Sequence, residues 1–185
     1  MFKLLLLGPS LRQDSSSAAL SRAFSARLSD RIEVAQFDIG TLPHYNADLG
    51  KPDEVQALIA AIDAADGVLF VTPEYNYSIP GVLKNAIDWA SRPAYKSAFR
   101  GKPCFIVTTS AGAMGGVRAQ SHLKYILNGM LARLFPWQEA IVPFANKKTV
   151  EGRFADEDVL VFLEAALTAF IDWAKLVGTK EGQEL

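Results

Sequence analysis

The chain has 185 residues, of which half are hydrophobic and 21% are charged, and its formal net charge is −1. A chain of this length is expected to form one domain that buries roughly 70% of the surface of the unfolded chain. The 19 basic and 20 acidic residues are spread along the chain, without the basic stripe that marks a nucleic-acid-binding face. The composition therefore favours a single globular domain that does not bind nucleic acid.

The remaining compositional features also exclude several classes. The apolar run near the N-terminus is short and stops at Gly-Pro, which favours a buried strand over a signal peptide, and no segment approaches the ~20 apolar residues of a membrane helix. Cys104 is the single cysteine, so we expect a core thiol and no disulfide. His44 and His122 are far apart, which leaves no metal-ligand spacing. We expect a cytoplasmic protein without a bound metal or membrane insertion.

Short apolar runs alternate with helical patterns along the whole chain. In chain order the patterns predict a strand over 2–8, a helix over 16–28, a strand over 31–39, a helix over 52–65, a strand over 67–72, a helix over 81–91, a strand over 102–110, a helix over 117–134, a strand over 137–144 and a helix over 155–177. Five βα units with nearly continuous apolar strands indicate an α/β fold with a parallel sheet covered by helices on both faces. Right-handed crossovers make this sheet doubly wound. Residues 1–178 are expected to form the single domain, and residues 179–185 a disordered tail.

Ligands of open parallel sheets bind outside the carboxyl ends of the strands. The loops that follow the first, third and fourth predicted strands are GPSLRQDSSS (8–17), TPEYNYSIPG (72–81) and TSAGAMGGVR (109–118). They are also the most chemically unusual stretches of the chain. A binding site is therefore predicted where these three loops meet.

The first loop brings serine hydroxyls and one guanidinium directly before a predicted helix. These groups belong to Ser10, Arg12, Ser15, Ser16 and Ser17. A helix N-terminus favours a phosphate, and hydroxyls and a guanidinium add donors around the same anion. Serine-rich helix starts are also common as simple N-caps, so both interpretations stay open. The loop matches neither G-x-G-x-x-G nor the Gly-Lys-Ser ending of a nucleotide triphosphate loop, which argues against a Rossmann dehydrogenase and an ATPase.

The other two loops suit a flat ligand. The central loop holds two tyrosines and Asn76 between Pro73 and Pro80, and prolines restrict the backbone. Such a rigid loop fits a planar aromatic ligand with polar edges. The small residues of SAGAMGG let the backbone approach a ring closely, although a flexible connection is the favoured interpretation of this loop by itself. Together the loops predict a ligand with a phosphate at one end and a flat ring at the other.

The three loops resemble a known family. GPSLRQDSSS, PEYNYSIPGVLKNAIDW and TSAGAMGG look like the corresponding stretches of the NADPH-dependent FMN reductases, the flavodoxin-like group that includes chromate, quinone and azo-dye reductases. The resemblance runs from about Leu4 to Phe144. It implies a flavodoxin-like fold with five parallel strands, a bound FMN, and NADPH or NADH as co-substrate. It also implies ping-pong hydride transfer to a quinone-like acceptor, with no catalytic side chain because the cofactor carries the chemistry, and assembly as a homodimer or homotetramer.

The resemblance also implies which residues contact FMN. The phosphate and ribityl end would be held by the first loop, through Ser10, Arg12, Ser15 and Ser17, with Leu11 and Ser16 in the same loop. The isoalloxazine would be bordered by the second loop, largely through main-chain groups of Pro73, Glu74, Tyr75 and Asn76. The far side of the pocket would be closed by Ser110 and Gly112. The chain departs from the family pattern in two places. Pro9 replaces the usual glycine before the first serine, and Ser17 stands where asparagine is common, which is expected to weaken a contact.

Some alternatives remain open at this point. Glu74 could act as a general acid, although a carboxylate oriented by neighbouring amides is the favoured interpretation. A flavodoxin-type electron carrier would share the fold and FMN, but such carriers are typically acidic and this chain is nearly neutral. A non-flavin regulatory domain could also use the fold. No motif reads the ribose 2′ position, so NADPH and NADH remain equal alternatives.

Overall fold

A computed structural model describes residues 1–178 of the chain, and the predicted tail, 179–185, lies outside the described residues. The central sheet contains β1 (Lys3–Leu7), β2 (Glu33–Gln36), β3 (Gly67–Pro73), β4 (Pro103–Thr109), β5 (Arg133–Leu134) and β6 (Ala140–Val142). The strand order is β2-β1-β3-β4-β5, β6 also pairs with β4, and every pair is parallel. This is the flavodoxin-like order, as expected.

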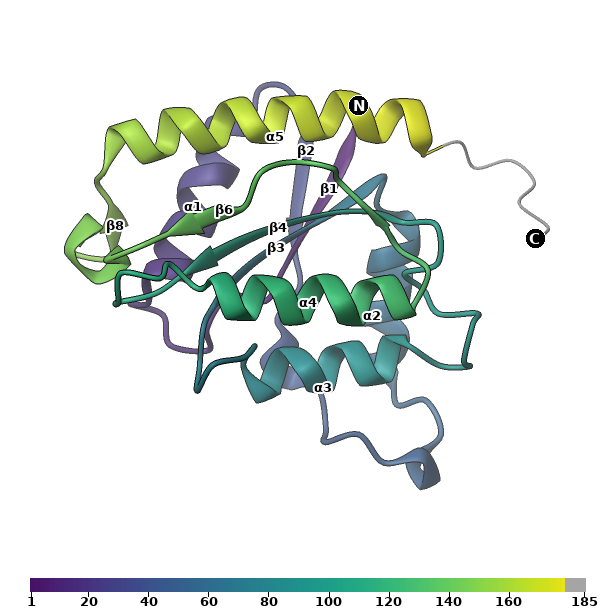
Figure 1. Cartoon of the computed structure of the whole chain (residues 1–185). Helices are drawn as coiled ribbons and strands as arrows, with labels where there is room; N and C mark the ends of the chain where they lie inside the picture. Colours follow the sequence, from purple (N-terminus) through teal and green to yellow (C-terminus); the bar gives the residue numbers. More distant parts are fainter. Residues whose placement is uncertain (179–185) are drawn as a thin grey trace.

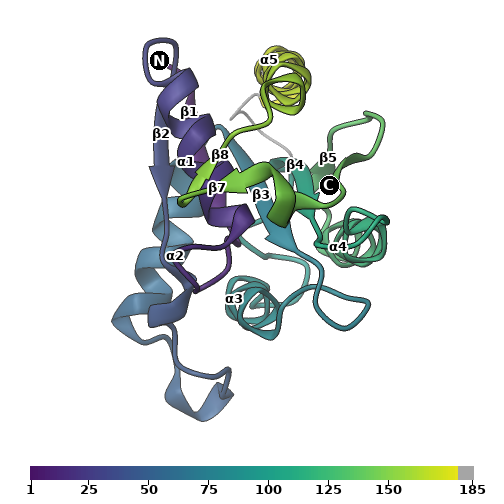
Figure 2. The ribbon, with the colours of Figure 1, turned by 90° about the vertical axis from the view of Figure 1, so that its left-hand side faces the viewer.

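Helices cover both faces of the sheet (Figures 1 and 2). They are α1 (Ser16–Leu28), α2 (Asp53–Ala64), α3 (Gly81–Ala90), α4 (Val117–Gly129) and α5 (Glu157–Val177). Leu4 and Leu6 of β1 belong to the cluster that includes α1 and α5, whereas Leu5 and Leu7 belong to the cluster that includes α2, α3 and α4. Successive side chains of a strand point to opposite faces, so a run of four leucines supplies both cores. The predicted doubly wound arrangement is confirmed.

The predicted last strand and its preceding helix differ from the structure. The helix ends at Gly129 rather than at 134, and Leu131 closes it with a positive φ of 61°. Of the strand predicted over 137–144, only Ala140–Val142 forms one, β6, which pairs with the end of β4. The start of β4 pairs instead with β5, Arg133–Leu134, which lies within the residues predicted as helix. Between β5 and β6 the chain contains Pro136, which has no amide hydrogen for a ladder. The fifth position of the sheet is therefore shared by two short segments.

The other differences are local. The second strand covers only 33–36 rather than 31–39, because Asp38 starts a 3₁₀ turn, Ile39–Thr41, by accepting a bond from the Gly40 amide at 2.9 Å. Two further 3₁₀ turns, Ala47–Leu49 and Ala145–Lys148, and a small antiparallel hairpin of β7 (Thr149–Val150) and β8 (Arg153–Phe154) were not predicted. Such short elements have too few residues to show a hydrophobic period.

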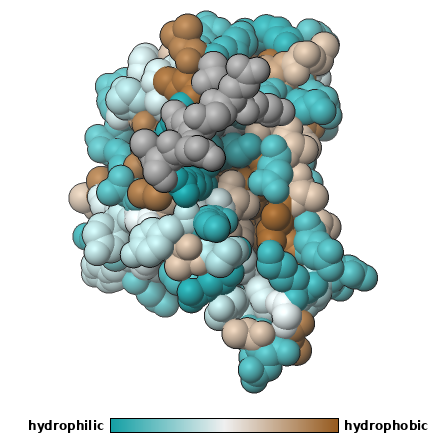
Figure 3. Space-filling view, turned by 90° about the vertical axis from the view of Figure 1, so that its right-hand side faces the viewer, coloured by the Kyte–Doolittle hydropathy of each residue, from teal (hydrophilic) through white to brown (hydrophobic). Residues whose placement is uncertain are grey.

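The surface, the single cysteine and the absence of a membrane helix within residues 1–178 can be compared with the expectations from composition. Figure 3 shows a face on which hydrophilic and intermediate residues predominate and hydrophobic residues form several separate patches. Cys104 is buried in β4, and burial raises the pKa of its thiol far above the usual value, which confirms a core role. Within residues 1–178, no helix has the length and apolar character needed to cross a membrane, and no cluster of His, Cys, Asp and Glu could hold a metal.

Candidate active site

The three predicted loops meet at the carboxyl edge of the sheet, the edge that faces the viewer in Figure 2. Together with the loop after β6 they enclose a cavity of about 210 Å³. Its lining residues are Arg12, Ser15, Ser16, Ser17, Pro73, Glu74, Tyr75, Thr109, Ser110, Ala111, Ala145 and Asn146. Residues from four separate chain segments thus share one pocket.

The serine loop is held in shape by its own hydroxyls. Ser15 is the N-cap of α1, and its hydroxyl accepts a hydrogen bond from the Ala18 amide at 3.1 Å. The Ser17 hydroxyl is buried, accepts from the Ser10 amide at 3.1 Å and lies 3.3 Å from the Ser15 hydroxyl. The N-cap interpretation of Ser15 is therefore confirmed.

The same loop still offers donors to a ligand. The amides of Ser16 and Ser17 lie in the first turn of α1, where no intrahelical acceptor exists, and no residue within 1–178 accepts from them. Arg12 also lines the cavity, and within residues 1–178 its guanidinium forms no ion pair with a carboxylate. Two free amides, a helix N-terminus and a guanidinium favour an anion at this end of the pocket.

The central loop contains a tight turn at the pocket rim. The amide of Tyr75 donates to the Ser78 carbonyl at 2.9 Å, and the Ser78 amide donates to the Tyr75 carbonyl at 3.0 Å. Between them Asn76 and Tyr77 have positive φ values of 46° and 67°, which is the geometry of a type I′ turn. Asparagine tolerates this conformation well, whereas tyrosine adopts it at a cost. Such strain is typical of functional loops.

Contacts with neighbouring segments hold this turn in place. The Tyr75 hydroxyl lies 3.1 Å from the Ser10 hydroxyl and so joins the central loop to the serine loop. On the other side the Ser78 hydroxyl lies 2.9 Å from Nδ1 of His122 in α4. The guanidinium of Arg118 lies 4.4 Å from the ring centroid of Tyr77. The turn is therefore fixed from two sides.

Glu74 caps a helix. Its carboxylate accepts bonds from the amides of Arg118 and Ala119 at 3.0 and 3.3 Å and from the Arg118 guanidinium at 3.2 Å. Its side chain is 11% exposed. A carboxylate at the N-terminus of α4 satisfies first-turn amides and interacts favourably with the helix dipole. The favoured interpretation of Glu74, a carboxylate oriented by amides, is confirmed.

The glycine-rich loop closes the remaining side. The Ser110 hydroxyl accepts from the Gly112 amide at 3.1 Å, and the Ser110 carbonyl accepts from the Ala145 amide at 2.8 Å. Gly116 has a φ of 89°, and a β-carbon there would lie 2.8 Å from Cβ of Thr108. The loop therefore needs glycine at this position, both for its backbone conformation and for its close approach to β4.

The structure brings most of the predicted residues together. Eight of them line the cavity: Arg12, Ser15, Ser16, Ser17, Pro73, Glu74, Tyr75 and Ser110. The Ser10 hydroxyl lies 3.1 Å from the hydroxyl of Tyr75, which lines the cavity. Ser10 and Leu11 both line a neighbouring polar cavity of about 360 Å³ beside Asp38. Asn76 and Gly112 shape their turns without lining the pocket. Contact of these residues with FMN stays a prediction.

Sequence reasoning missed Thr109, Ala111, Ala145 and Asn146 as lining residues. Thr109 and Ala111 lie inside the third loop that the sequence singled out, but they carry no distinctive chemistry. Ala145 and Asn146 follow β6, the fifth carboxyl end. The rule that ligands lie beyond strand ends could have found them, had the loop after the fifth strand been considered with the other three.

These residues fit FMN at its polar end. Free helix amides and a guanidinium are the donors that a phosphate needs. The cavity of about 210 Å³ is smaller than the ~300–1,000 Å³ of sites that enclose a whole drug-sized ligand. Its size therefore suits the phosphate and the chain attached to it rather than the whole cofactor.

The sheet order and the pocket beyond its carboxyl edge place the protein in the flavodoxin-like class of α/β proteins. Residues 2–147 match the model of the NADPH-dependent FMN reductase family. The chain is 36% identical over 176 residues to a 2-hydroxy-1,4-benzoquinone reductase from a Burkholderia species, covering 94% of this chain and 96% of that one. It is 40% identical over 178 residues to an NAD(P)H-dependent FMN reductase of Pseudomonas aeruginosa, covering 94% and 95%. The protein thus belongs to the NADPH-dependent FMN reductase family and is an oxidoreductase.

A solved structure agrees with this assignment. FerB, a flavoenzyme NAD(P)H:acceptor oxidoreductase from Paracoccus denitrificans, superimposes with a TM-score of 0.86 at 36% identity, covering 97% of this chain and 100% of that one. Membership of this family argues against the non-flavin regulatory domain. It also means that a flavin and a nicotinamide co-substrate are implied for this chain.

Proposed function

We propose that the protein is an FMN-dependent reductase that takes a hydride from NADPH or NADH and reduces quinone-like acceptors in a ping-pong sequence. One observation carries the proposal: a single pocket joins the anion-binding start of α1 to the rigid turn after β3. The quinone class is supported by the relative from Burkholderia, whose name specifies a benzoquinone. Free FMN, azo dyes and chromate are further acceptors suggested by the family resemblance.

The chain's own groups would bind the cofactor as follows. The amides of Ser16 and Ser17 and the guanidinium of Arg12 hold the phosphate, while the hydroxyls of Ser15 and Ser17 keep the loop in shape for it. The main chain of residues 73–76 borders the ring. Bound FMN supplies the chemistry, since it accepts a hydride and passes on two electrons.

Protein side chains then act by positioning rather than by proton transfer. The Glu74 carboxylate is already engaged by α4, so it is not free to act as a general acid. The fixed turn at Tyr75 keeps backbone groups in place at the ring edge. NAD(P)H and the acceptor would use the same space in turn, as a ping-pong sequence requires.

Replacing Arg12 tests the cofactor site. Arg12→Ala removes a charge-assisted bond worth roughly 1.5–3 kcal/mol, so we expect FMN affinity to fall by about 10–100-fold. Lys175→Ala makes the same change of charge at an exposed position on α5 and should leave affinity unchanged. Equal FMN affinity of Arg12→Ala and the wild type, measured by fluorescence titration of the apoprotein, would show that the phosphate lies elsewhere.

Steady-state kinetics separate the reductase from an electron carrier. With FMN bound, NAD(P)H oxidation should proceed continuously with a benzoquinone, and double-reciprocal plots at several quinone concentrations should be parallel. Intersecting lines would contradict the ping-pong sequence. Stable FMN binding without turnover would favour the flavodoxin-type carrier instead.

We also propose that the protein self-associates as a homodimer or homotetramer. In the segment 123–135, which is rich in apolar residues, Tyr125 is 83% exposed and Leu131 is 47% exposed to solvent. Trp137, just beyond it, is 40% exposed. Exposed aromatic side chains of this kind are enriched at protein interfaces. Light scattering at micromolar concentration should give the mass of a dimer or tetramer, and Tyr125→Glu should lower that mass if α4 is the interface.

A further inference from the structure

The serine loop between β1 and α1 is held from outside the pocket by Arg22, a residue in the second turn of α1. Its guanidinium donates to the Gln13 carbonyl from both Nη1 and Nη2 at 3.3 Å, and Nη2 also donates to the Gly152 carbonyl at 2.8 Å. Gly152 lies 130 residues later in the chain, at the turn of the β7–β8 hairpin. Arg22 does not line the cavity at the carboxyl edge. It therefore joins the hairpin to the serine loop without being part of the ligand pocket.

The Gln13 carbonyl belongs to the central peptide of a β-turn. The Ser15 amide donates to the Arg12 carbonyl at 3.1 Å, so Gln13 and Asp14 are the two central residues. Asp14 has no positive φ, which makes the turn type I rather than type II. The two types differ by a flip of the central peptide, which reverses the Gln13 carbonyl and the Asp14 amide together because the peptide is planar. Within residues 1–178 no backbone amide donates to this carbonyl, so its orientation depends on the guanidinium.

The hairpin is a well-defined anchor for the guanidinium. Glu151 and Gly152 connect its strands with positive φ values of 47° and 73°, the geometry of a type I′ turn, which matches the twist of the flanking strands. Phe154 of β8 is buried in the same core cluster as Leu20 and Phe24 of α1. Figure 2 shows the hairpin beside α1. The Gly152 carbonyl is therefore fixed relative to α1.

We propose that Arg22 is a positioning residue for FMN, which holds the serine loop in the conformation that receives the phosphate. The inference rests on the proposed function, in which Arg12 and the first amides of α1 bind that phosphate. Gln13 and Asp14 lie between these two parts of the site, so a bridge that fixes their shared peptide also limits the motion of one part relative to the other. A loop that is already ordered loses less conformational entropy when its ligand binds. Arginine suits this role because its planar fork of donors reaches two acceptors at once, whereas lysine presents one compact ammonium.

The test compares FMN with riboflavin, which has the same ring and ribityl chain but no phosphate. Fluorescence titration of the apoprotein gives the affinity for each flavin, and the ratio of the two affinities reports on the phosphate site. Because the bonds of Arg22 are exposed to solvent, we expect Arg22→Ala to lower the preference for FMN by only about threefold to tenfold. Arg22→Lys keeps the charge but does not bridge both carbonyls, so its ratio should stay close to that of Arg22→Ala.

Two further variants separate positioning from stability. Arg27→Ala removes a cation of the same helix, which pairs with Glu157 and Glu164 of α5. It should lower the free energy of unfolding in urea and leave the ratio unchanged. Gly152→Ala strains the hairpin turn, because its φ is 73°, while the added carbon stays 3.9 Å from Nη2 of Arg22. It should lower the ratio in the wild type but not in the Arg22→Ala protein, because the hairpin acts on the loop through Arg22.

Three results would overturn the proposal. The first is an unchanged ratio in Arg22→Ala, whether the two affinities stay the same or fall equally. The second is a ratio that Arg22→Lys restores to the wild-type value, which would show that charge alone matters. The third is additive effects of Gly152→Ala and Arg22→Ala, which would show that the hairpin acts independently of the guanidinium.

The same titrations distinguish failure of this inference from failure of the proposed function. A wild-type protein that binds FMN no more tightly than riboflavin would refute the phosphate site, and with it both the proposed function and the role of Arg22. A wild-type preference for FMN that persists in full in Arg22→Ala would leave the proposed function standing and refute only the role of Arg22.

Discussion

Replacing Glu74 distinguishes a structural carboxylate from a catalytic one. Glu74→Ala deprives the amides of Arg118 and Ala119 of their acceptor, at 3.0 and 3.3 Å, and leaves the Arg118 guanidinium without its carboxylate. Loss of an N-cap costs about 0.5–2 kcal/mol, and an amide left unsatisfied costs about 1–3 kcal/mol. Because these amides are only partly buried, we expect the free energy of unfolding to fall by about 2 kcal/mol, which is a fall in Tm of about 4–8 °C for a chain of this size.

Glu74→Gln is the informative companion variant. The amide side chain keeps one oxygen for the α4 amides and loses only the charge, so we expect a cost of about 0.5–1 kcal/mol. Turnover with NADPH and a quinone should stay within about twofold of the wild type, because the proposed mechanism does not use this carboxyl as an acid. Asp88→Ala, which breaks an exposed pair with Lys84, is the control and should cost only about 0.3–0.5 kcal/mol.

The assay combines urea denaturation with steady-state kinetics on the FMN-loaded protein. A hundredfold loss of kcat in Glu74→Gln, with FMN binding and Tm unchanged, would refute the structural assignment and restore the general-acid interpretation. An unchanged free energy of unfolding in Glu74→Ala would show instead that the cap contributes nothing to stability.

Two further predictions concern the loops around the site. Gly116→Ala should destabilise the protein by about 1–3 kcal/mol in urea denaturation, because its φ is 89° and the added carbon would lie 2.8 Å from Cβ of Thr108. Gly129→Ala is the control, since the added carbon meets nothing within 4 Å, and it should be neutral or stabilising in the same measurement. The Lys148 side chain lowers the pKa of Asp156, the N-cap of α5. The ionised carboxylate of Asp156 therefore stabilises the folded protein above about pH 4, and this stabilisation is lost as the pH falls through the lowered folded-state pKa. Asp156→Asn should therefore lose less stability than the wild type below pH 4 in acid denaturation, and an identical acid profile would contradict the assignment.

The amino-acid sequence by itself determined the alternation of strands and helices, the edge at which the site lies and the loops that build it. These features are local: apolar runs such as that of β3, the serine-rich start of α1 and the prolines around Tyr75 are legible within a few residues. The two residues that pair with the start of β4, Arg133–Leu134, were wrongly assigned to the preceding helix, because their apolar pattern continues that of α4. The strand predicted over 137–144 forms only at Ala140–Val142.

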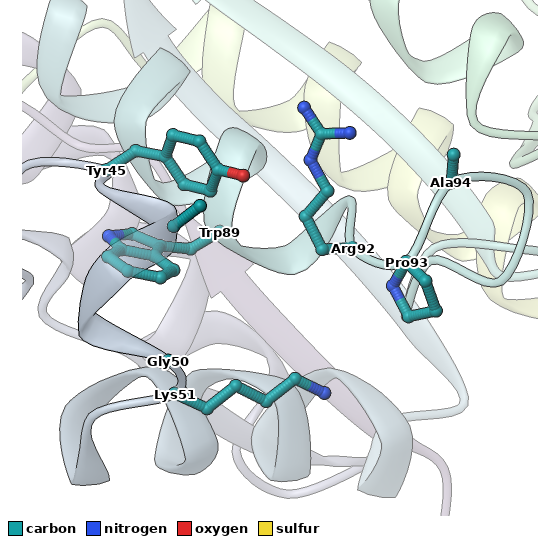
Figure 4. A pocket seen from close by; sticks show the side chains of 8 residues that line it. Tyr45, Gly50, Lys51, Trp89, Arg92, Pro93 and Ala94 are labelled. Carbon is teal, nitrogen blue, oxygen red and sulfur yellow. The ribbon is translucent and has the colours of Figure 1, made fainter.

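The partners of the site residues were decided only by the tertiary structure. Glu74 caps a helix that begins 43 residues later in the chain, at Val117, and Tyr45 meets Trp89 and Arg92 across a similar separation (Figure 4). Nothing in a local pattern says which amide a carboxylate will reach, or which cation will be left unpaired. Those outcomes depend on how the crossovers place α3 and α4 against the sheet, because hydrogen bonds and ring contacts act only over a few ångströms. The sequence therefore predicted which loops build the candidate site, while the fold decided which groups within it are paired with one another.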